Sequence, residues 1–172
     1  MSIADMLAII SGLVILGFAF PSLLLIINLV FPHLVNTSKQ QIVTKPIANT
    51  FQGLAIFLVC FFALAIFINI PGPGKLLALV IFLVMLSIAM IGFAGLVSHL
   101  AAKYQDFSKS NKSVTNLFYS AFFLELTFVL PFIGWFVMLP ITFFMSLTAG
   151  TKALIQNSKS LPVATSSSPE LI

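Results

Sequence analysis

Ionisable side chains are scarce in this sequence. Only 7% of its 172 residues are charged, whereas 60% are hydrophobic and the mean hydropathy is +1.16. Soluble globular domains carry about 25% charged residues, and the long apolar runs leave only short polar segments between them. The composition therefore excludes a soluble globular domain. It predicts an all-α integral membrane protein that is not an enzyme.

Cysteine and arginine are equally rare. Cys60 is the single cysteine, which excludes an intrachain disulfide, and lysine supplies all eight basic side chains other than histidine. Proteins that bind nucleic acid usually carry a basic stripe that contains arginine, but these lysines are scattered between the apolar runs. We expect no nucleic-acid partner, and we interpret the lysines as signals of membrane topology.

The apolar residues form runs that predict transmembrane helices, because about 20 such residues cross a bilayer. The expected spans are residues 7–31, 51–70, 76–100, 114–130 and 135–154. They form one membrane domain, 1–155, with polar connections at 32–46 and 101–116. The tail, 156–172, is rich in serine and proline and is expected to be disordered.

Two turns divide the later spans into helical hairpins. Pro71-Gly72-Pro73-Gly74 leaves no helix-compatible continuation, so the chain must turn there. Pro131-Phe132-Ile133-Gly134 resembles that turn, and Asn116 to Ser120 resembles Asn49 to Gly53. This weak repeat predicts a second hairpin, giving five spans; a single crossing by 118–154 would give four.

Lysine placement favours the hairpin, because lysines near spans collect on the cytoplasmic side. With five spans, one side of the membrane holds seven lysines, and only Lys75 lies opposite. These seven are Lys39, Lys45, Lys103, Lys109, Lys112, Lys152 and Lys159. The prediction is an N-terminus outside and a C-terminus in the cytoplasm.

Small residues recur every four positions in two of the spans. Such stripes let helix backbones approach closely in lipid. We expect them to pack against a sibling helix or a partner subunit. The two stripes are Ala94, Ser98 and Ala102, and Thr142, Ser146 and Gly150.

Glu125 is the only ionisable side chain well inside an apolar run. It lies seven residues beyond Phe118, about 10 Å along a helix, where a carboxylate costs several kcal/mol. One interpretation is an ion or proton site. The other is a structural role, as a protonated carboxyl group hydrogen-bonded to a neighbouring helix.

His33 and His99 each lie at an expected helix end. A histidine at such a depth could ligate a metal or the magnesium of a chlorin, but no carboxylate or cysteine lies at metal-site spacing from either residue. We therefore expect interfacial capping by both and no metal site. No cofactor is predicted, although the nineteen phenylalanines could line a lipid or a chlorin pigment.

Several segments together resemble a known group of proteins. They are Phe31-Pro32 before a polar segment, Lys45-Pro46 before Asn49 to Gly53, and Leu124-Glu125-Leu126 followed by Leu130 to Phe136. They are similar to small multi-span bacterial, notably cyanobacterial, membrane proteins of unknown function. A similar helical region is attached to some bactofilin-like proteins. The resemblance implies a bacterial inner or thylakoid membrane and no particular activity.

Two functions are consistent with the sequence. The first is a non-enzymatic scaffold or accessory subunit of a larger membrane complex, in contact with lipids and other subunits. The second is a small transporter or channel-like protein that uses Glu125. Broken helices near Pro131 and Pro140 favour the second, because transporters place such breaks at their binding sites.

Overall fold

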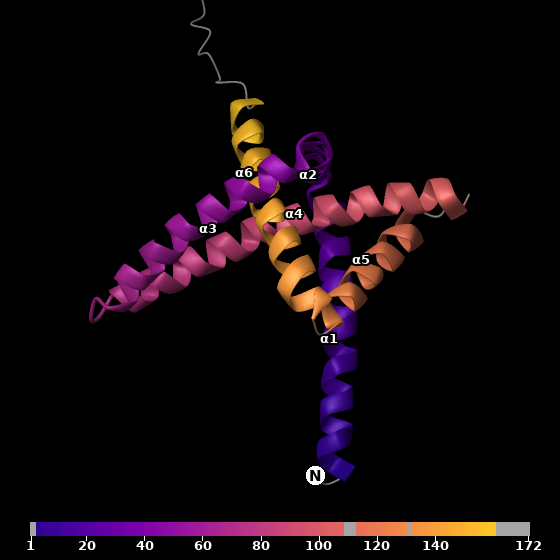
Figure 1. The fold of residues 1–172 in the computed structure, drawn as a ribbon, viewed down its shortest axis with the longest axis horizontal. Coiled ribbons are helices and arrows are strands. Elements are labelled where there is room, and N and C mark those ends of the chain that lie inside the picture. The colour runs from indigo at the N-terminus through magenta and orange to yellow at the C-terminus, as the bar shows by residue number, and fades with distance from the viewer. Residues whose placement is uncertain (1–2, 109–112, 131, 161–172) are drawn as a thin grey trace, which may run out of the picture.

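The computed structural model describes residues 3–108, 113–130 and 132–160, and helices are the only regular structure in those ranges. In chain order they are α1 (Ile3–Val30), α2 (Pro32–Thr44), α3 (Pro46–Ile68), α4 (Gly74–Ser108), α5 (Ser113–Val129), the π-helix η1 (Gly134–Met138) and α6 (Leu139–Ser160). Figure 1 shows that α3 and α4 lie side by side, whereas α1 and α6 cross α4.

Three stretches of helix within the described residues are long and apolar enough to cross a membrane: Pro46–Ile68, Gly74–Phe107 and Gly134–Lys159. A fourth results if Gly17–Val30 and Pro32–Thr44, which meet at a bend of 108°, count as one span. The described part of the chain is thus all-helical, and its helices suit insertion into a membrane.

Helix α2 replaces the polar connection expected at 32–46. Proline suits its first turn, where a backbone N–H would have no partner in any case. Its buried residues are Leu34, Val35, Ser38 and Ile42, which recur at helical spacing along one face. That face packs on α4 and α6, so tertiary contacts stabilise a helix whose overall composition is polar.

Two other helices also extend into segments expected to be irregular. Helix α4 continues eight residues past Leu100, into the segment 101–116. Helix α6 runs to Ser160, so the first five residues of the expected tail are helical. Residues 161–172 lie outside the described residues, as does Pro131.

The first predicted turn joins α3 to α4 as a tight hairpin (Figure 1). Gly72 adopts a φ of 82°, a conformation that side chains disfavour. Gly74 begins α4 and lies against the last turn of α3, where a Cβ would come within 2.5 Å of the carbonyl oxygen of Phe67. Glycine is therefore required both for the turn and for the close return of the chain.

The second hairpin is open. Helix α5 contacts η1 and then diverges from α6, so the two helices form a V (Figure 1). Gly134 lies against the last turns of α5, because a Cβ there would overlap the carbonyl oxygen of Thr127. Helix α5 packs instead on α1 and α4, which leaves space between α5 and α6.

The centre of the fold is the crossing of α4 and α6, with α3 beside it (Figure 1). A Cβ on Gly92 would overlap the backbone of Ser146, and one on Gly150 would overlap the carbonyl oxygen of Ile88. Gly53 of α3 meets the backbone of α6 in the same way. Because an added carbon would clash at each point, glycine sets how closely these helices approach.

Candidate ligand cavity beside Glu125

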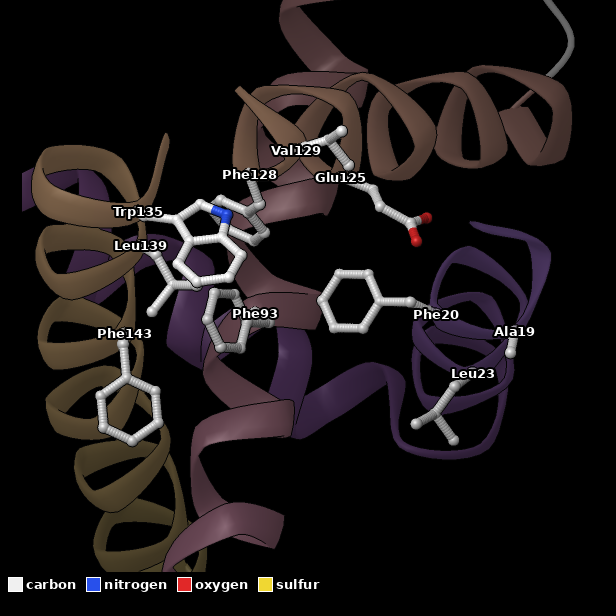
Figure 2. A pocket seen from close by; sticks show the side chains of 10 residues that line it. All are labelled: Ala19, Phe20, Leu23, Phe93, Glu125, Phe128, Val129, Trp135, Leu139 and Phe143. Carbon is white, nitrogen blue, oxygen red and sulfur yellow. The ribbon is translucent and has the colours of Figure 1, made fainter. Parts of the chain in front are cut away.

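The position of Glu125 follows from the packing of α5. Ala121 and Leu124 are buried on the α5 face that meets α1 and α4. Glu125 follows Leu124 on the helix, and its side chain points toward α1, next to the ring of Phe20 (Figure 2). The carboxyl group therefore lies between two helices, half-buried.

A cavity of about 690 Å³ opens beside Glu125. Its walls come from α1, α4, α5, η1 and α6, so it occupies the space that the divergence of α5 and α6 leaves (Figure 2). Ala19, Leu23, Val129 and Leu139 supply the aliphatic part of the wall. A cavity of this size and apolar character suits a small lipophilic molecule.

Aromatic rings form the rest of the wall: Phe20, Phe93, Phe128, Trp135 and Phe143. Three of these rings pack edge to face, with centroids 6.0 Å apart for Phe20 and Phe93, 6.5 Å for Phe20 and Phe128, and 6.1 Å for Phe93 and Phe128. Such mutual packing holds the rings in place, so part of the wall is formed before any ligand binds.

Glu125 is the only charged residue among those that line the cavity. Its Oε2 atom is buried and has no hydrogen-bond partner in the described part of the protein. Its Oε1 atom lies 4.0 Å from the position that a Cβ would take on Gly17 of α1. An unpaired carboxyl oxygen in apolar surroundings is costly, which makes this the least satisfied polar group of the cavity.

Two serine hydroxyls, of Ser38 and Ser146, share this lack of a partner among the described residues. Their setting is different, because each lies at a contact between helices. Ser38 meets Gly95, and Ser146 meets Gly92. Small size explains a serine at such a contact, whereas it does not explain a glutamate beside a cavity.

A second polar cluster joins α2, α3 and α6. Its centre is Asn49, which is fully buried. Asn49 Nδ2 donates to the carbonyl oxygen of Gln41 (2.7 Å), Lys152 Nζ donates to Asn49 Oδ1 (2.8 Å), and Thr148 Oγ1 donates to the Asn49 carbonyl oxygen (2.7 Å). The Asn49 side-chain nitrogen, its side-chain oxygen and its backbone carbonyl oxygen all have hydrogen-bond partners. This complete pairing indicates a structural role for the cluster.

Sequence reasoning singled out Asn49 only as part of a repeat and did not predict this cluster. The matching residue in that repeat, Asn116, is also buried. One signal in the sequence could have indicated the cluster. Both copies of the repeat place an asparagine at the start of an apolar run.

The two histidines lie away from the cavity lining. His33 is exposed in the first turn of α2, and His99 is half-buried on α4. No group of three histidine, cysteine, aspartate or glutamate side chains that could hold a metal occurs among the described residues. The structure thus does not bring His33 or His99 together with Glu125.

The predicted packing stripes occupy different environments. Ser146 is fully buried, Thr142 is 8% exposed, and Gly150 meets the backbone of α4. On α4, Ala94 is buried and its carbonyl oxygen accepts a 3.3 Å hydrogen bond from Asn28 Nδ2 of α1. The other two members of that stripe, Ser98 and Ala102, are half-buried.

The cavity therefore combines a preformed aromatic wall with one unpaired carboxyl group. This arrangement can hold a lipophilic molecule and offer it one hydrogen-bond acceptor.

Comparisons with protein-family models, with curated proteins and with solved structures find no match to this chain.

Proposed function

We propose that this chain is a non-enzymatic membrane protein that holds a lipophilic ligand, a lipid or a pigment, and serves a larger membrane complex as scaffold or accessory subunit. The observation that carries the proposal is the 690 Å³ cavity with Glu125 in its wall. Its lining offers extensive apolar surface and one carboxyl group, which suits binding better than bond-making chemistry.

Extraction of the purified protein tests the ligand. After purification in mild detergent, organic extracts are compared by mass spectrometry between the wild type and Ala19→Phe, which fills part of the cavity. We expect a lipophilic molecule at a fixed molar ratio in the wild type and its loss in the variant. An equal amount in both proteins would contradict ligand binding in this cavity.

The accessory role draws support from α3. Only Asn49 and Gly53 of this helix are buried, so most of its apolar surface is free to contact lipid or another subunit. The same purification tests this role. Stoichiometric co-elution with a larger membrane complex is expected, and elution of the isolated chain alone would count against it.

For the topology, the proposal is five spans with the N-terminus outside and the C-terminus in the cytoplasm. The contact between Lys152 near the end of α6 and Asn49 near the start of α3 supports it, since both then lie at one membrane face. An even number of crossings must separate them, as a hairpin of α5 and α6 provides. Topology reporters fused after Thr44 and after Lys159 should then report the same side.

A bacterial inner or thylakoid membrane is the proposed location, on the basis of the resemblance described above. Membrane fractionation of the source cells tests the location.

Five spans also require α5 to enter the membrane. Its 17 residues extend only about 25 Å, so this limb would be partly inserted and buried against α1 and α4.

A transporter or channel-like function is the second candidate. The unpaired Oε2 atom of Glu125 favours it, as does the π-helix η1 at the start of α6, because π-helical turns often occur at functional sites. Reconstituted vesicles test it through ion or proton flux. Flux that Glu125→Gln abolishes would support this candidate over a purely accessory role.

A further inference from the structure

The cavity beside Glu125 has an uneven distribution of charge. A carboxylate in its wall faces apolar and aromatic side chains, and none of the residues that line the cavity is basic. We propose that the occupant is a lipophilic ammonium ion, whose N–H group donates to the Glu125 carboxylate and whose apolar body packs against the aromatic wall. This inference rests on the proposed role of the cavity in ligand binding.

The first argument comes from the carboxylate in the cavity wall. A charge-assisted N–H···O hydrogen bond to it is roughly twice as strong as a neutral one. It would also neutralise a charge that is expensive to keep in hydrocarbon. An alcohol would satisfy the hydrogen bond but not the charge.

The aromatic wall supplies the second argument. Cations are attracted to the faces of aromatic rings within about 6 Å. Figure 2 shows the ring of Phe20 next to the Glu125 carboxyl group, with the rings of Phe93 and Phe128 beyond it. A cation held at Glu125 would therefore also lie near a ring, whereas an anionic lipid head would be repelled by the carboxylate.

Trp135 is the only tryptophan of the chain and lines the cavity, so its fluorescence can report occupancy directly. The protein is reconstituted in phosphatidylcholine nanodiscs and titrated with a terminally brominated dodecylammonium or with the brominated dodecanol of equal length. Bromine quenches only nearby tryptophan. We expect saturable quenching by the ammonium at an apparent Kd about tenfold below that of the alcohol, a difference of about 1.4 kcal/mol.

Variants separate the cavity from general partitioning into the bilayer. Glu125→Gln should remove the tenfold preference for the ammonium, whereas Glu125→Asp, which keeps the charge, should retain part of it. The combination of Trp135→Phe and Phe62→Trp moves the reporter to the exposed surface of α3. There both molecules should quench equally and without saturation.

The outcomes distinguish this inference from the function on which it rests. If the ammonium and the alcohol bind with equal affinity and Ala19→Phe abolishes both, the cavity binds a neutral ligand and the ammonium proposal is overturned. If quenching of Trp135 matches that of the α3 reporter for both molecules, the cavity holds neither. That result would overturn the ammonium proposal and the ligand-binding function together.

Discussion

Two polar side chains lie among apolar helices in this protein, and their surroundings differ. Asn49 is fully buried, and both polar atoms of its side chain have partners. Its Nδ2 atom donates to α2, and its Oδ1 atom accepts from α6. Glu125 borders a cavity, and its Oε2 atom has no partner within the described ranges. The paired group joins three helices, whereas the unpaired group lies in the wall of a cavity.

The helices around the two groups pack differently as well. Near Asn49, glycines allow α3 and α4 to touch the backbone of α6. Near Glu125, bulky aromatic rings line the cavity that lies between α5 and α6. Small residues thus close one side of the fold, and large residues hold the other side open. Substitutions on the two sides should therefore have opposite effects on the free energy of unfolding.

The largest effect is expected at the closed side. Gly92→Ala adds a Cβ that overlaps the backbone of Ser146, and overpacking of this kind costs about 3 kcal/mol. Reversible unfolding in mixed micelles, followed by circular dichroism, measures the loss. Gly12→Ala is the matched control, because nothing lies within 4 Å of its added carbon; equal stability of the two variants would show that the crossing is not tight.

Removal of the paired group should have the next largest effect. Asn49→Ala leaves the Lys152 ammonium and the Gln41 carbonyl oxygen without their partners, which costs about 2 kcal/mol. The control is Asn69→Ala, since Asn69 is exposed and its side chain bonds only to Ala65 within the same helix. It should change the free energy of unfolding by less than about 0.5 kcal/mol.

A double-mutant cycle sharpens this prediction. Lys152→Met combined with Asn49→Ala should show a coupling energy of about 1 kcal/mol or more, as expected for residues in one hydrogen-bond network. Additive effects would mean that the two side chains do not depend on each other, and the argument that they share one membrane face would lose its support.

The open side should respond in the opposite direction. Glu125→Gln removes a charge without breaking a described hydrogen bond, so the free energy of unfolding should stay the same or rise by about 1 kcal/mol. The measurement is the same unfolding titration used for Asn49→Ala. A loss as large as that of Asn49→Ala would make Glu125 a structural partner and remove the contrast between the two groups.

Much of the helical organisation can be predicted from hydrophobic runs and turn residues. The apolar run 51–70 and the segment Pro71 to Gly74 predict α3 and its turn because both signals are local. Helix α2 escaped prediction because its mean polarity hides the spacing of Leu34, Val35, Ser38 and Ile42. In that segment, the period of the apolar residues is more informative than their number.

The site could be predicted only in part. Glu125 stands out because it is the one acid inside an apolar run. The cavity around it depends on the divergence of α5 from α6 and on rings from α1 and α4, which are far apart in the sequence. The same limit applies to Gly92 and Gly95, because a single helix offers small residues on several faces and its partner decides which face is used.

The smallest effect is expected for Ser146→Ala, and it tests whether an unpaired polar atom is by itself a sign of function. The Ser146 hydroxyl has no partner among the described residues, as is true of Glu125 Oε2, but it lies at a helix contact rather than at a cavity. Alanine keeps the small volume that the contact with Gly92 requires, so the free energy of unfolding should change by less than about 0.5 kcal/mol.

Ser146→Val is the comparison variant, since Ser146 is fully buried and a larger side chain there should overpack the contact and destabilise the protein as Gly92→Ala does. If Ser146→Ala alone cost more than about 1 kcal/mol, the hydroxyl would have a partner in the membrane-bound protein. Lack of a partner would then no longer distinguish Glu125. If size alone governs position 146, what sets Glu125 apart is the cavity that its side chain lines.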